Sequence, residues 1–458
     1  MTPTRLLNLL RAAPLALLLA LLPALALAQQ PEANPTDKDK PPADQRKGIE
    51  IDVRAGARRV LTSVAVPDTL TTGGAPATTA SQVQRTLRED LDLAGYFSII
   101  APAQLFFDPS KEGMDADKID YKNWANVKAQ GLIKSAVVKR GEGLFLDLQL
   151  HAVDSQKRIP IKGFAAPVPV GKDVNKQVHA FVNEVVRYYT GKPGQLGAQI
   201  VFVKRNSAGL KQIYAMSLGS QQIWPITRNS AINLLPSVDK QGRIYYTSYL
   251  HQNPDLWVYE GGKHHKLSAQ RGQNSGAARC GDKLALTLSM GGENTDIYLI
   301  DPKSGQIKQR LTNHWAIDTS PTFSPDCSKI AFVSGRSSSP HIYVMDADGS
   351  NQRRLTYQGT YNTTPVWSPK GDVIAFTARD ERNRFDVFTV NLEGNIERLT
   401  QNQGNNEDPS FSPDGRYIVY TSTRGGKGRR IWLMTSDGQH QRELIKKGSE
   451  YSAPVWSP

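Results

Sequence analysis

Side chains that could do chemistry are scattered along this 458-residue chain rather than gathered in one motif. Two of the eight histidines, His264 and His265, are adjacent, but neighbouring strand residues point to opposite faces, which favours a surface loop over a metal site. No His-Glu-x-x-His, Gly-x-Ser-x-Gly or phosphate-binding glycine motif occurs. The sequence therefore predicts no catalytic residue, no metal and no cofactor.

Four aspartates near the expected inner strands have two possible roles. They are Asp318, Asp326, Asp408 and Asp414. Their carboxylates could line a common channel and bind a cation. Aspartate next to proline and glycine more often accepts hydrogen bonds within a turn. We expect the turn role for this set.

A repeat positions these residues. Pro365-Val366-Trp367-Ser368-Pro369 recurs in related form from Pro321, Pro409 and Pro454, with the leading prolines 44, 44 and 45 residues apart. Each unit holds short β-branched and aromatic runs separated by Asp-Gly or Pro, a pattern typical of four antiparallel strands. A period of about 40–45 residues is the length of one propeller blade.

Six such units follow one another, because the second strand of the unit can be counted six times. It begins near Ile200, Ile244, Leu284, Ile330, Ile374 and Ile418. The chain ends on a copy of the inner-strand motif with nothing after it, so we expect 452–458 to close the ring as the inner strand of the first blade. The predicted fold class is mixed, an N-terminal α/β domain followed by a six-bladed β-propeller over 199–458.

The start of the chain predicts export. Residues 1–28 combine a cationic start with an apolar run and the small-residue site Ala26-Leu27-Ala28, which indicates a secretory signal peptide cleaved near Ala28. The alternative, a membrane anchor, is less favoured because the run is interrupted by Pro14 and Pro23 and is short for a bilayer span. Residues 29–48 have almost no apolar side chains, so we expect a disordered linker.

Residues 49–191 follow a different pattern, which predicts an α/β domain. We expect strands over 49–53 and 60–66, a helix over 81–93 with Val83, Leu87 and Leu91 on its apolar face, a hairpin of 131–139 with 144–153, and a helix over 173–189. Residues 192–198 are the expected hinge into the propeller.

The net charge limits the class of partner, and the two cysteines raise the question of a disulfide. The chain carries a net charge of +13, and removing 1–28 removes two arginines and no acid, which leaves +11. A basic surface favours acidic partners, and nucleic acid is not expected for an exported protein. Cys280 and Cys327 occupy adjacent units. We expect two buried thiols rather than a disulfide, on the premise that equivalent positions on neighbouring blades diverge from the axis.

The order of these parts resembles one family. A signal peptide, a domain opening with Ile49-Glu50-Ile51-Asp52-Val53, a hinge, and repeats ending on Pro454-Val455-Trp456-Ser457-Pro458 are similar to the TolB family of soluble periplasmic Tol-Pal proteins in Gram-negative bacteria. The resemblance covers 49–458. It implies a non-enzymatic periplasmic adaptor between the peptidoglycan-associated lipoprotein Pal and the inner-membrane proteins TolA, TolQ and TolR, serving envelope integrity and cell division.

The resemblance also implies a partner-binding face, formed by loops that precede the repeated Pro-x-Phe-Ser-Pro motif. The residues expected to bind Pal there are Asn274, His314, Thr319, Ser320, Thr363, Thr364, Glu407 and Asp408. The third unit departs from the family, with 275–280 where the motif should be, and the family's TolA contact would fall near the linker. The alternatives are a propeller enzyme or saccharide-binding module with its site in the channel mouth, and a peptidoglycan-binding protein suggested by charge alone.

Overall fold

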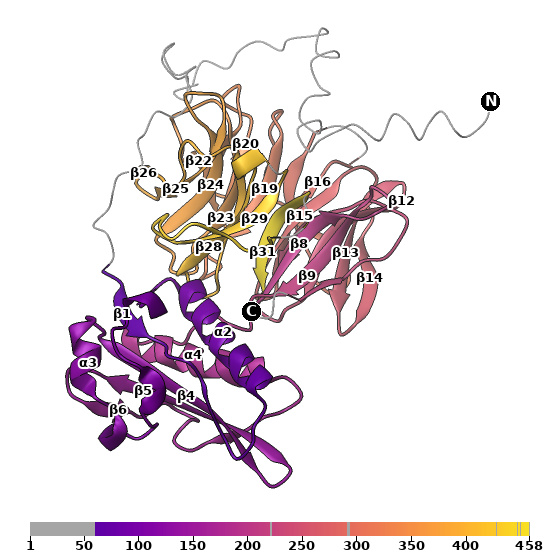
Figure 1. The fold of residues 1–458 in the computed structure, drawn as a ribbon. Helices are drawn as coiled ribbons and strands as arrows, with labels where there is room; N and C mark the ends of the chain where they lie inside the picture. Colours follow the sequence, from indigo (N-terminus) through magenta and orange to yellow (C-terminus); the bar gives the residue numbers. More distant parts are fainter. Residues whose placement is uncertain are drawn as a thin grey trace. The chain divides into compact units, whose positions relative to one another are not determined.

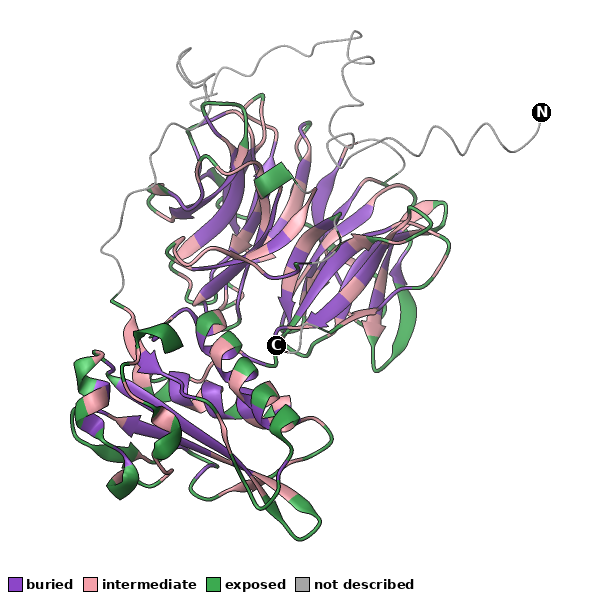
Figure 2. Ribbon diagram, in the orientation of Figure 1, coloured by how far each residue is buried: buried purple, intermediate pink, exposed green. Residues whose placement is uncertain are grey.

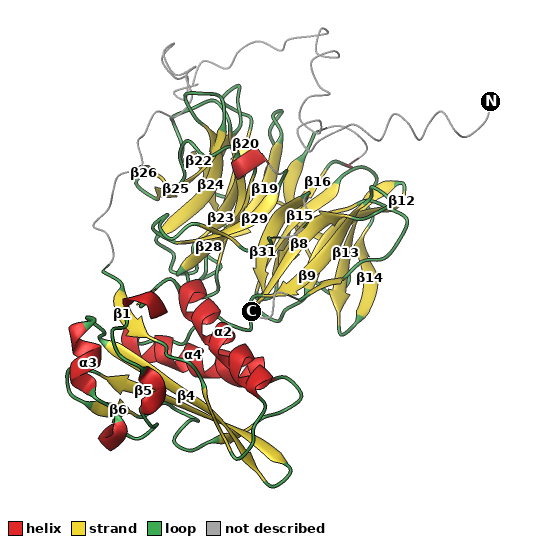
Figure 3. Cartoon of the chain, viewed as in Figure 1, coloured by secondary structure: helices red, strands yellow, loops and turns green. Residues whose placement is uncertain are grey.

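The protein is described by a computed structural model that covers residues 60–219, 222–290, 294–426, 428–446, 448 and 450–457 (Figure 1). The predicted signal peptide (1–28), linker (29–48) and first strand (49–53) lie outside these residues. Figure 3 shows the helices gathered in the part that precedes the propeller, apart from a short turn at Arg424–Gly426. Among the residues described, no helix combines the length and apolarity needed to cross a membrane.

The first part is an α/β domain built on one mixed sheet. Its strands are β1 (Thr62–Ala65), β2 (Leu70–Thr72), β3 (Phe97–Ile99), β4 (Gly131–Arg140), β5 (Gly143–Ala152), β6 (Lys157–Ile159) and β7 (Val168–Pro169). The order is β3-β1-β4-β5-β6, with β2 pairing with β4 and β7 with β5. Strand β1 runs parallel to β3 and β4, whereas β4 and β5 form the predicted antiparallel hairpin.

Two long helices pack side by side in this domain, α2 (Ala77–Ala94) and α4 (Val174–Thr190), and a short one, α3 (Tyr121–Asn126), contributes to a second core (Figure 1). The predicted apolar face of α2 is fully buried at Val83, Leu87 and Leu91. Gly95 ends α2 with a left-handed backbone, φ 67°, which glycine adopts without a side-chain clash. Both helices begin and end close to the predicted residues.

The remaining strands form six four-stranded antiparallel sheets, which confirms the predicted six-bladed propeller. From inner to outer strand, blade 1 is β31 (Tyr451–Ser457), β8 (Gln199–Arg205), β9 (Lys211–Ser217) and β10 (Ile223–Pro225); blade 2 is β11 (Asn233–Val238), β12 (Ile244–His251), β13 (Asn253–Glu260) and β14 (Lys263–Ser268); blade 3 is β15 (Asn274–Cys280), β16 (Lys283–Leu288), β17 (Asp296–Ile300) and β18 (Ile307–Arg310). Blade 4 is β19 (Asp318–Phe323), β20 (Lys329–Ser334), β21 (His341–Asp346) and β22 (Arg353–Arg354); blade 5 is β23 (Asn362–Trp367), β24 (Val373–Arg379), β25 (Phe385–Asn391) and β26 (Ile396–Arg398); blade 6 is β27 (Asn406–Phe411), β28 (Tyr417–Ser422), β29 (Arg430–Thr435) and β30 (Arg442–Glu443). The buried residues concentrate in the inner three strands of each blade, and the loops are exposed (Figure 2).

The last strand closes the ring, as predicted. Strand β31 pairs antiparallel with β8, with Trp456 opposite Ile200, so the two ends of the propeller share one sheet (Figure 1). Trp456 is 5% exposed and stacks on Tyr417 of blade 6 with ring centroids 6.0 Å apart. Closure therefore buries a large aromatic side chain between the first and last blades, which removes two exposed strand edges.

The prediction of two free thiols is wrong. Cys280 and Cys327 form a disulfide with Cα atoms 5.7 Å apart. The two cysteines do not occupy equivalent positions, because Cys280 ends the inner strand β15 whereas Cys327 lies in the turn after β19, with φ 63°. That turn reaches the neighbouring blade at the end of its inner strand, so the bond ties blade 3 to blade 4.

Candidate functional site: the axial channel and the entry face

Every inner strand carries the same irregularity. Its register shifts at one point, and the residue at the shift has a left-handed backbone with φ between 48° and 63°. These six residues are Leu235, Gly276, Ser320, Thr364, Asp408 and Ala453. In five blades a proline follows, and in blade 3 Ala277 takes its place. A bulge of this kind bends the strand and turns its side chains.

The bulges surround an axial channel of about 590 Å³, to which all six inner strands contribute. The six left-handed residues and the residues after them line one end. Deeper, the wall is aromatic in four blades, at Phe323, Trp367, Phe411 and Trp456, and Val238 and Arg279 replace these rings in blades 2 and 3. The channel is therefore mainly apolar with a few polar groups, which is the usual composition of a binding cavity.

The loops beside the bulges form one face of the propeller, here called the entry face. It consists of the six loops that lead from an outer strand into the next inner strand and the loops that join second to third strands. Antiparallel order places both sets at the same end of the blades. The predicted partner-binding residues belong to this end of the propeller.

Seven of the eight predicted residues lie inside inner strands rather than in loops, and six of these form three adjacent pairs. Thr319 and Ser320 belong to β19, Thr363 and Thr364 to β23, and Glu407 and Asp408 to β27. The second member of each pair is the bulge residue and lines the channel. Several of these side chains also support the strands themselves.

Two of these contacts show the structural role. Thr364 Oγ1 lies 2.7 Å from Thr377 Oγ1 on the next strand. Asp408 accepts hydrogen bonds from Thr421 Oγ1 at 3.2 Å and from the backbone N–H of Ala453 at 3.1 Å, so it links blade 6 to the closing strand. Substitutions at these two positions would therefore disturb the fold as well as the channel mouth.

The other two predicted residues differ in exposure. Asn274 is fully buried at the start of β15, where its amide bonds Ser268 and the backbone of Gln270 and Gly272, so it shapes the loop from within. His314 is half-buried and accepts a hydrogen bond from the Ala316 N–H at 3.1 Å. Its neighbour Trp315 is 76% exposed, and no sequence motif singles it out.

Electrostatics at the channel mouth centre on Glu407. Burial, with the adjacent Asp408 carboxylate adding to it, raises the pKa of Glu407 to about 7, although Arg429 lies 3.2 Å from its carboxylate. Burial likewise raises the pKa of Asp408. Both acids thus pair with groups inside the propeller, and Glu407 is only partly charged near neutral pH.

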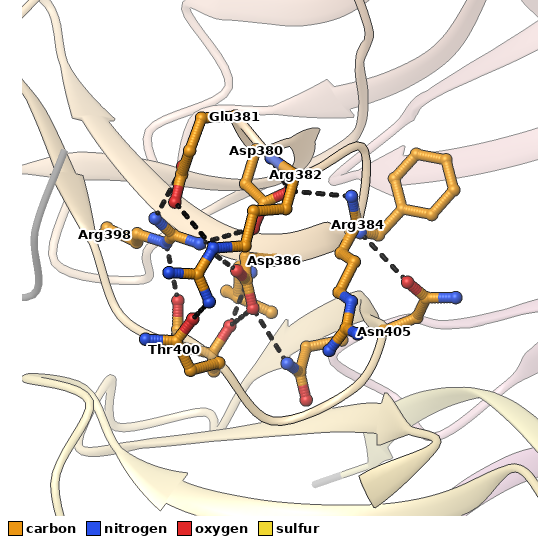
Figure 4. A network of polar contacts seen from close by, with 12 residues as sticks. Asp380, Glu381, Arg382, Arg384, Asp386, Arg398, Thr400 and Asn405 are labelled. Carbon is orange, nitrogen blue, oxygen red and sulfur yellow. Dashed lines mark hydrogen bonds and ion pairs between the residues drawn. The ribbon is translucent and has the colours of Figure 1, made fainter. Parts of the chain in front are cut away.

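A repeated buried network supports the entry face from below (Figure 4). In blade 5, Arg398 donates to Asp386 at 2.5 Å and to Asp380 at 2.8 Å, and Thr400 Oγ1 donates to Asp386 at 2.6 Å. Asn406 of blade 6 donates to the same Asp386 oxygen at 2.8 Å, so the network joins two blades. The recurring Arg-Leu-Thr at 310–312, 354–356 and 398–400 is the sequence signal for it.

Chemically, this arrangement is suited to binding. Within the described ranges, no group of three or more His, Cys, Asp or Glu side chains could hold a metal ion. Asp326 and Asp414 accept hydrogen bonds from Ser324 and Ser412 inside turns, which confirms the turn role expected for them. Asp318 instead pairs with Arg336 at 2.7 Å.

A six-bladed propeller closed by its last strand and preceded by an α/β domain defines a class of two-part propeller proteins. A family model described as "TolB beta propeller domain" matches residues 186–458, and one described as "TolB amino-terminal domain" matches residues 49–159. The propeller model alone covers more than half of the chain. The chain therefore belongs to the TolB family.

Relatives agree with this assignment. A "Protein TolB homolog" of Chlorobium luteolum is 31% identical over 299 residues, 64% of this chain and 66% of that protein. A "Tol-Pal system protein TolB" of Anaeromyxobacter dehalogenans is 37% identical over 249 residues, 53% of this chain and 56% of that protein. The matched stretch thus spans less than two thirds of these relatives' own length. TolB from Acinetobacter baumannii shares the fold, with a TM-score of 0.74 at 22% identity over 90% of this chain and 98% of that one.

Proposed function

We propose that this protein is a periplasmic adaptor of the Tol-Pal system. In this proposal its entry face binds the peptidoglycan-associated lipoprotein Pal, and the protein links Pal to TolA and the other inner-membrane Tol proteins. Membership of the TolB family supports the role, as do relatives that carry the name "Tol-Pal system protein". Peptidoglycan is a further candidate partner because of the basic charge.

The observation that carries the proposal is an exposed tryptophan on a braced loop of the entry face. Trp315 is 76% exposed, and the loop around it is fixed by Asn294, whose amide donates to the backbone oxygens of His314 and, at 2.8 Å, Ala316. Tryptophan side chains at the centre of protein interfaces often carry much of the binding energy. A rigid loop also lowers the entropy lost on binding.

The channel favours binding over catalysis. Its wall is mainly apolar, with proline and aromatic side chains prominent, and the polar bulge residues Thr364 and Asp408 are already bonded within the propeller. The wall serines Ser324 and Ser412 donate to Asp326 and Asp414 within turns, so these carboxylates are already used by the fold. The proposed TolA contact and the signal peptide involve residues outside those the structure describes.

The test is capture of purified Pal by the mature protein, followed by the same measurement on two variants. Trp315→Ala should weaken capture about tenfold or more, since a hot-spot truncation costs about 2 kcal/mol or more. Thr363→Arg should block docking by its bulk. The substitution should leave the fold intact, because no hydrogen bond of the described structure depends on the Thr363 side chain.

Gln306→Arg is the matched control, since Gln306 is exposed between β17 and β18 at the opposite end of the blades. It should bind Pal normally, and all three variants should keep the melting temperature of the parent. Normal capture by both Trp315→Ala and Thr363→Arg would rule out the entry face as the Pal site.

A further inference from the structure

Three entry-face loops of blades 5 and 6 are locked into one surface. They are 380–384 between β24 and β25, 399–405 between β26 and β27, and the loop from Thr423 to Arg429 between β28 and β29. Asn405 joins all three: its side-chain oxygen accepts from the Phe385 N–H at 3.2 Å, and its backbone exchanges two 2.9 Å hydrogen bonds with Thr423. The loops therefore hold their side chains on a common, rigid support.

The acids of this surface face inward and its arginines face outward. Asp380 accepts from the backbone N–H groups of Arg382 and Arg384, and its second oxygen bonds the buried Arg398 (Figure 4). Glu381 also forms an ion pair with Arg398, with a carboxylate oxygen 3.1 Å from the guanidinium nitrogen. The side chains of Arg382 and Arg384 are exposed. Asp380 thus pairs with Arg398, whereas Glu381 pairs with both Arg398 and, at 3.9 Å, Arg382. The exposed guanidinium groups of Arg382 and Arg384 make the outer side of the loop positive.

Further arginines extend this positive surface. Arg424, next to it on blade 6, donates to Gln403 and stacks on Trp432, with its guanidinium carbon 4.1 Å from the ring centroid. Arg379 stacks on Tyr361 and Phe385 at 5.1 and 5.3 Å. Arg384 has no ion-pair partner within 4.0 Å among the residues described. We call the set Arg379, Arg382, Arg384 and Arg424 the arginine platform.

We propose that the arginine platform binds an acidic, extended segment of a protein partner, with the carboxylates paired to guanidinium groups. The proposal rests on the proposed function, because it assigns chemistry to the partner of the same face. Guanidinium groups pair with carboxylates in a fixed, two-pronged geometry. Arginine and aromatic side chains together are enriched at protein interfaces, and this platform combines both.

Separate anchoring argues for a chain of carboxylates rather than one phosphate. Arg382 is held by Asn402, Arg424 by Gln403 and Gln441, and Arg379 by two rings, so three of the four guanidinium groups are fixed by separate neighbours. A single phosphate would need donors converging on one point. Charges distributed over the end of β24, the loop 380–384 and the loop after β28 instead match successive acidic side chains.

The first experiment measures binding of a decaglutamate peptide to the mature protein by calorimetry at several salt concentrations. We expect binding that weakens as salt increases, and a loss of about tenfold for Arg384→Glu. Arg271→Glu is the matched control, since Arg271 is an exposed arginine of the same face on the loop between β14 and β15. It should change the affinity less than about twofold. Equal losses in both variants would overturn the platform, because net charge alone would then explain binding.

Two further measurements separate the remaining explanations. Vesicles containing phosphatidylglycerol should show no dependence on Arg384, and a loss of vesicle binding in Arg384→Glu would replace the acidic protein with a lipid phosphate. With the soluble part of Pal, unchanged binding by Arg384→Glu would overturn this inference while leaving the proposed function intact. Failure of the parent protein to bind Pal, with the decaglutamate difference preserved, would instead overturn the proposed function and leave an acidic partner to be found.

Discussion

The contact between blades 5 and 6 and the contact between blades 4 and 5, here called blade joints, each contain a buried polar network. The two networks have the same geometry but different side chains. Where blade 5 meets blade 6, the buried Asp386 receives Arg398, Thr400 and Asn406. Where blade 4 meets blade 5, His341 holds the same place, 2.9 Å from Arg354 and 2.8 Å from Asn362. The arginine in each joint donates to the backbone oxygen of its threonine, at 2.7 Å in blade 4 and 3.0 Å in blade 5.

The difference between the two joints decides which way the charged side chains of the loop above them point. Arg398 is fully buried as a side chain and contacts three acids, Asp380, Glu381 and Asp386, which turns the acidic part of the loop inward. In blade 4, burial and the nearby Arg354 charge lower the pKa of His341 to about 3, so its ring is neutral near pH 7. The two joints share the placement of their arginine and threonine, but the first contains carboxylates where the second contains a neutral ring. The arginine platform lies above the joint between blades 5 and 6.

The largest expected effect comes from removing the carboxylate of the blade 5 joint. Asp386→Ala leaves Arg398 buried with one acid fewer and deprives Thr400 and Asn406 of their acceptor. Breaking a buried ion pair in this way costs about 3–5 kcal/mol. Urea unfolding should show that loss, and His341→Ala, the matched change in blade 4, should cost clearly less because it removes a neutral ring and breaks no ion pair. Equal losses would show that the two joints do not differ in electrostatics.

A third joint sharpens the comparison because it is covalent. The Cys280–Cys327 disulfide spans 47 residues and ties blade 3 to blade 4. Its removal in the Cys280→Ser, Cys327→Ser variant should cost about 2–4 kcal/mol, since the unfolded chain gains freedom. Thermal unfolding with and without reductant checks this. Reductant should lower the melting temperature of the parent and leave that of the double variant unchanged.

The propeller and its closure were predictable from sequence because four copies of one motif recur every 44 or 45 residues and the second strand of the unit can be counted six times. Pro454 to Pro458 is a copy lacking its own blade. The disulfide was not predicted, because treating the cysteines as equivalent ignored their spacing of 47 residues where the motif repeats every 44. Those three extra residues carry Cys327 past the strand end and into the turn.

The candidate site was only partly accessible to sequence reasoning. The motif drew attention to Ser320, Thr364 and Asp408, which line the channel. A bulge inside a strand cannot be distinguished from a loop by residue type, since both favour polar residues and proline. Trp315 and Arg384 lie outside the repeated motif. Their importance depends on exposure and on contacts between loops from different blades, which a single sequence does not reveal.

Acid should weaken the blade 4 joint through His341. Its pKa in the folded protein is about 3, below the ordinary value of 6.5, so the unfolded chain binds the proton more readily. Stability from this group is therefore complete above about pH 6.5 and declines toward pH 3, by about 1.4 kcal/mol per pH unit. His341→Asn should remove that part of the slope between about pH 6.5 and 5. An unchanged slope would mean that another group is responsible.

The smallest expected effect tests a hydroxyl that the two joints do not share. Thr377 Oγ1 accepts the backbone N–H of Asp408 at 3.1 Å and lies 2.7 Å from Thr364 Oγ1, whereas Val333 holds the corresponding place in blade 4. Thr377→Val keeps the volume and removes both contacts, so it should cost about 1–2 kcal/mol in urea unfolding. Val333→Thr is the reciprocal change, and it should alter stability by less than about 1 kcal/mol, because any new hydrogen bond is offset by burying a hydroxyl. If Thr377→Val cost nothing, the hydroxyl would not link blades 5 and 6, and the difference between the joints would reduce to the charge at Asp386 and His341.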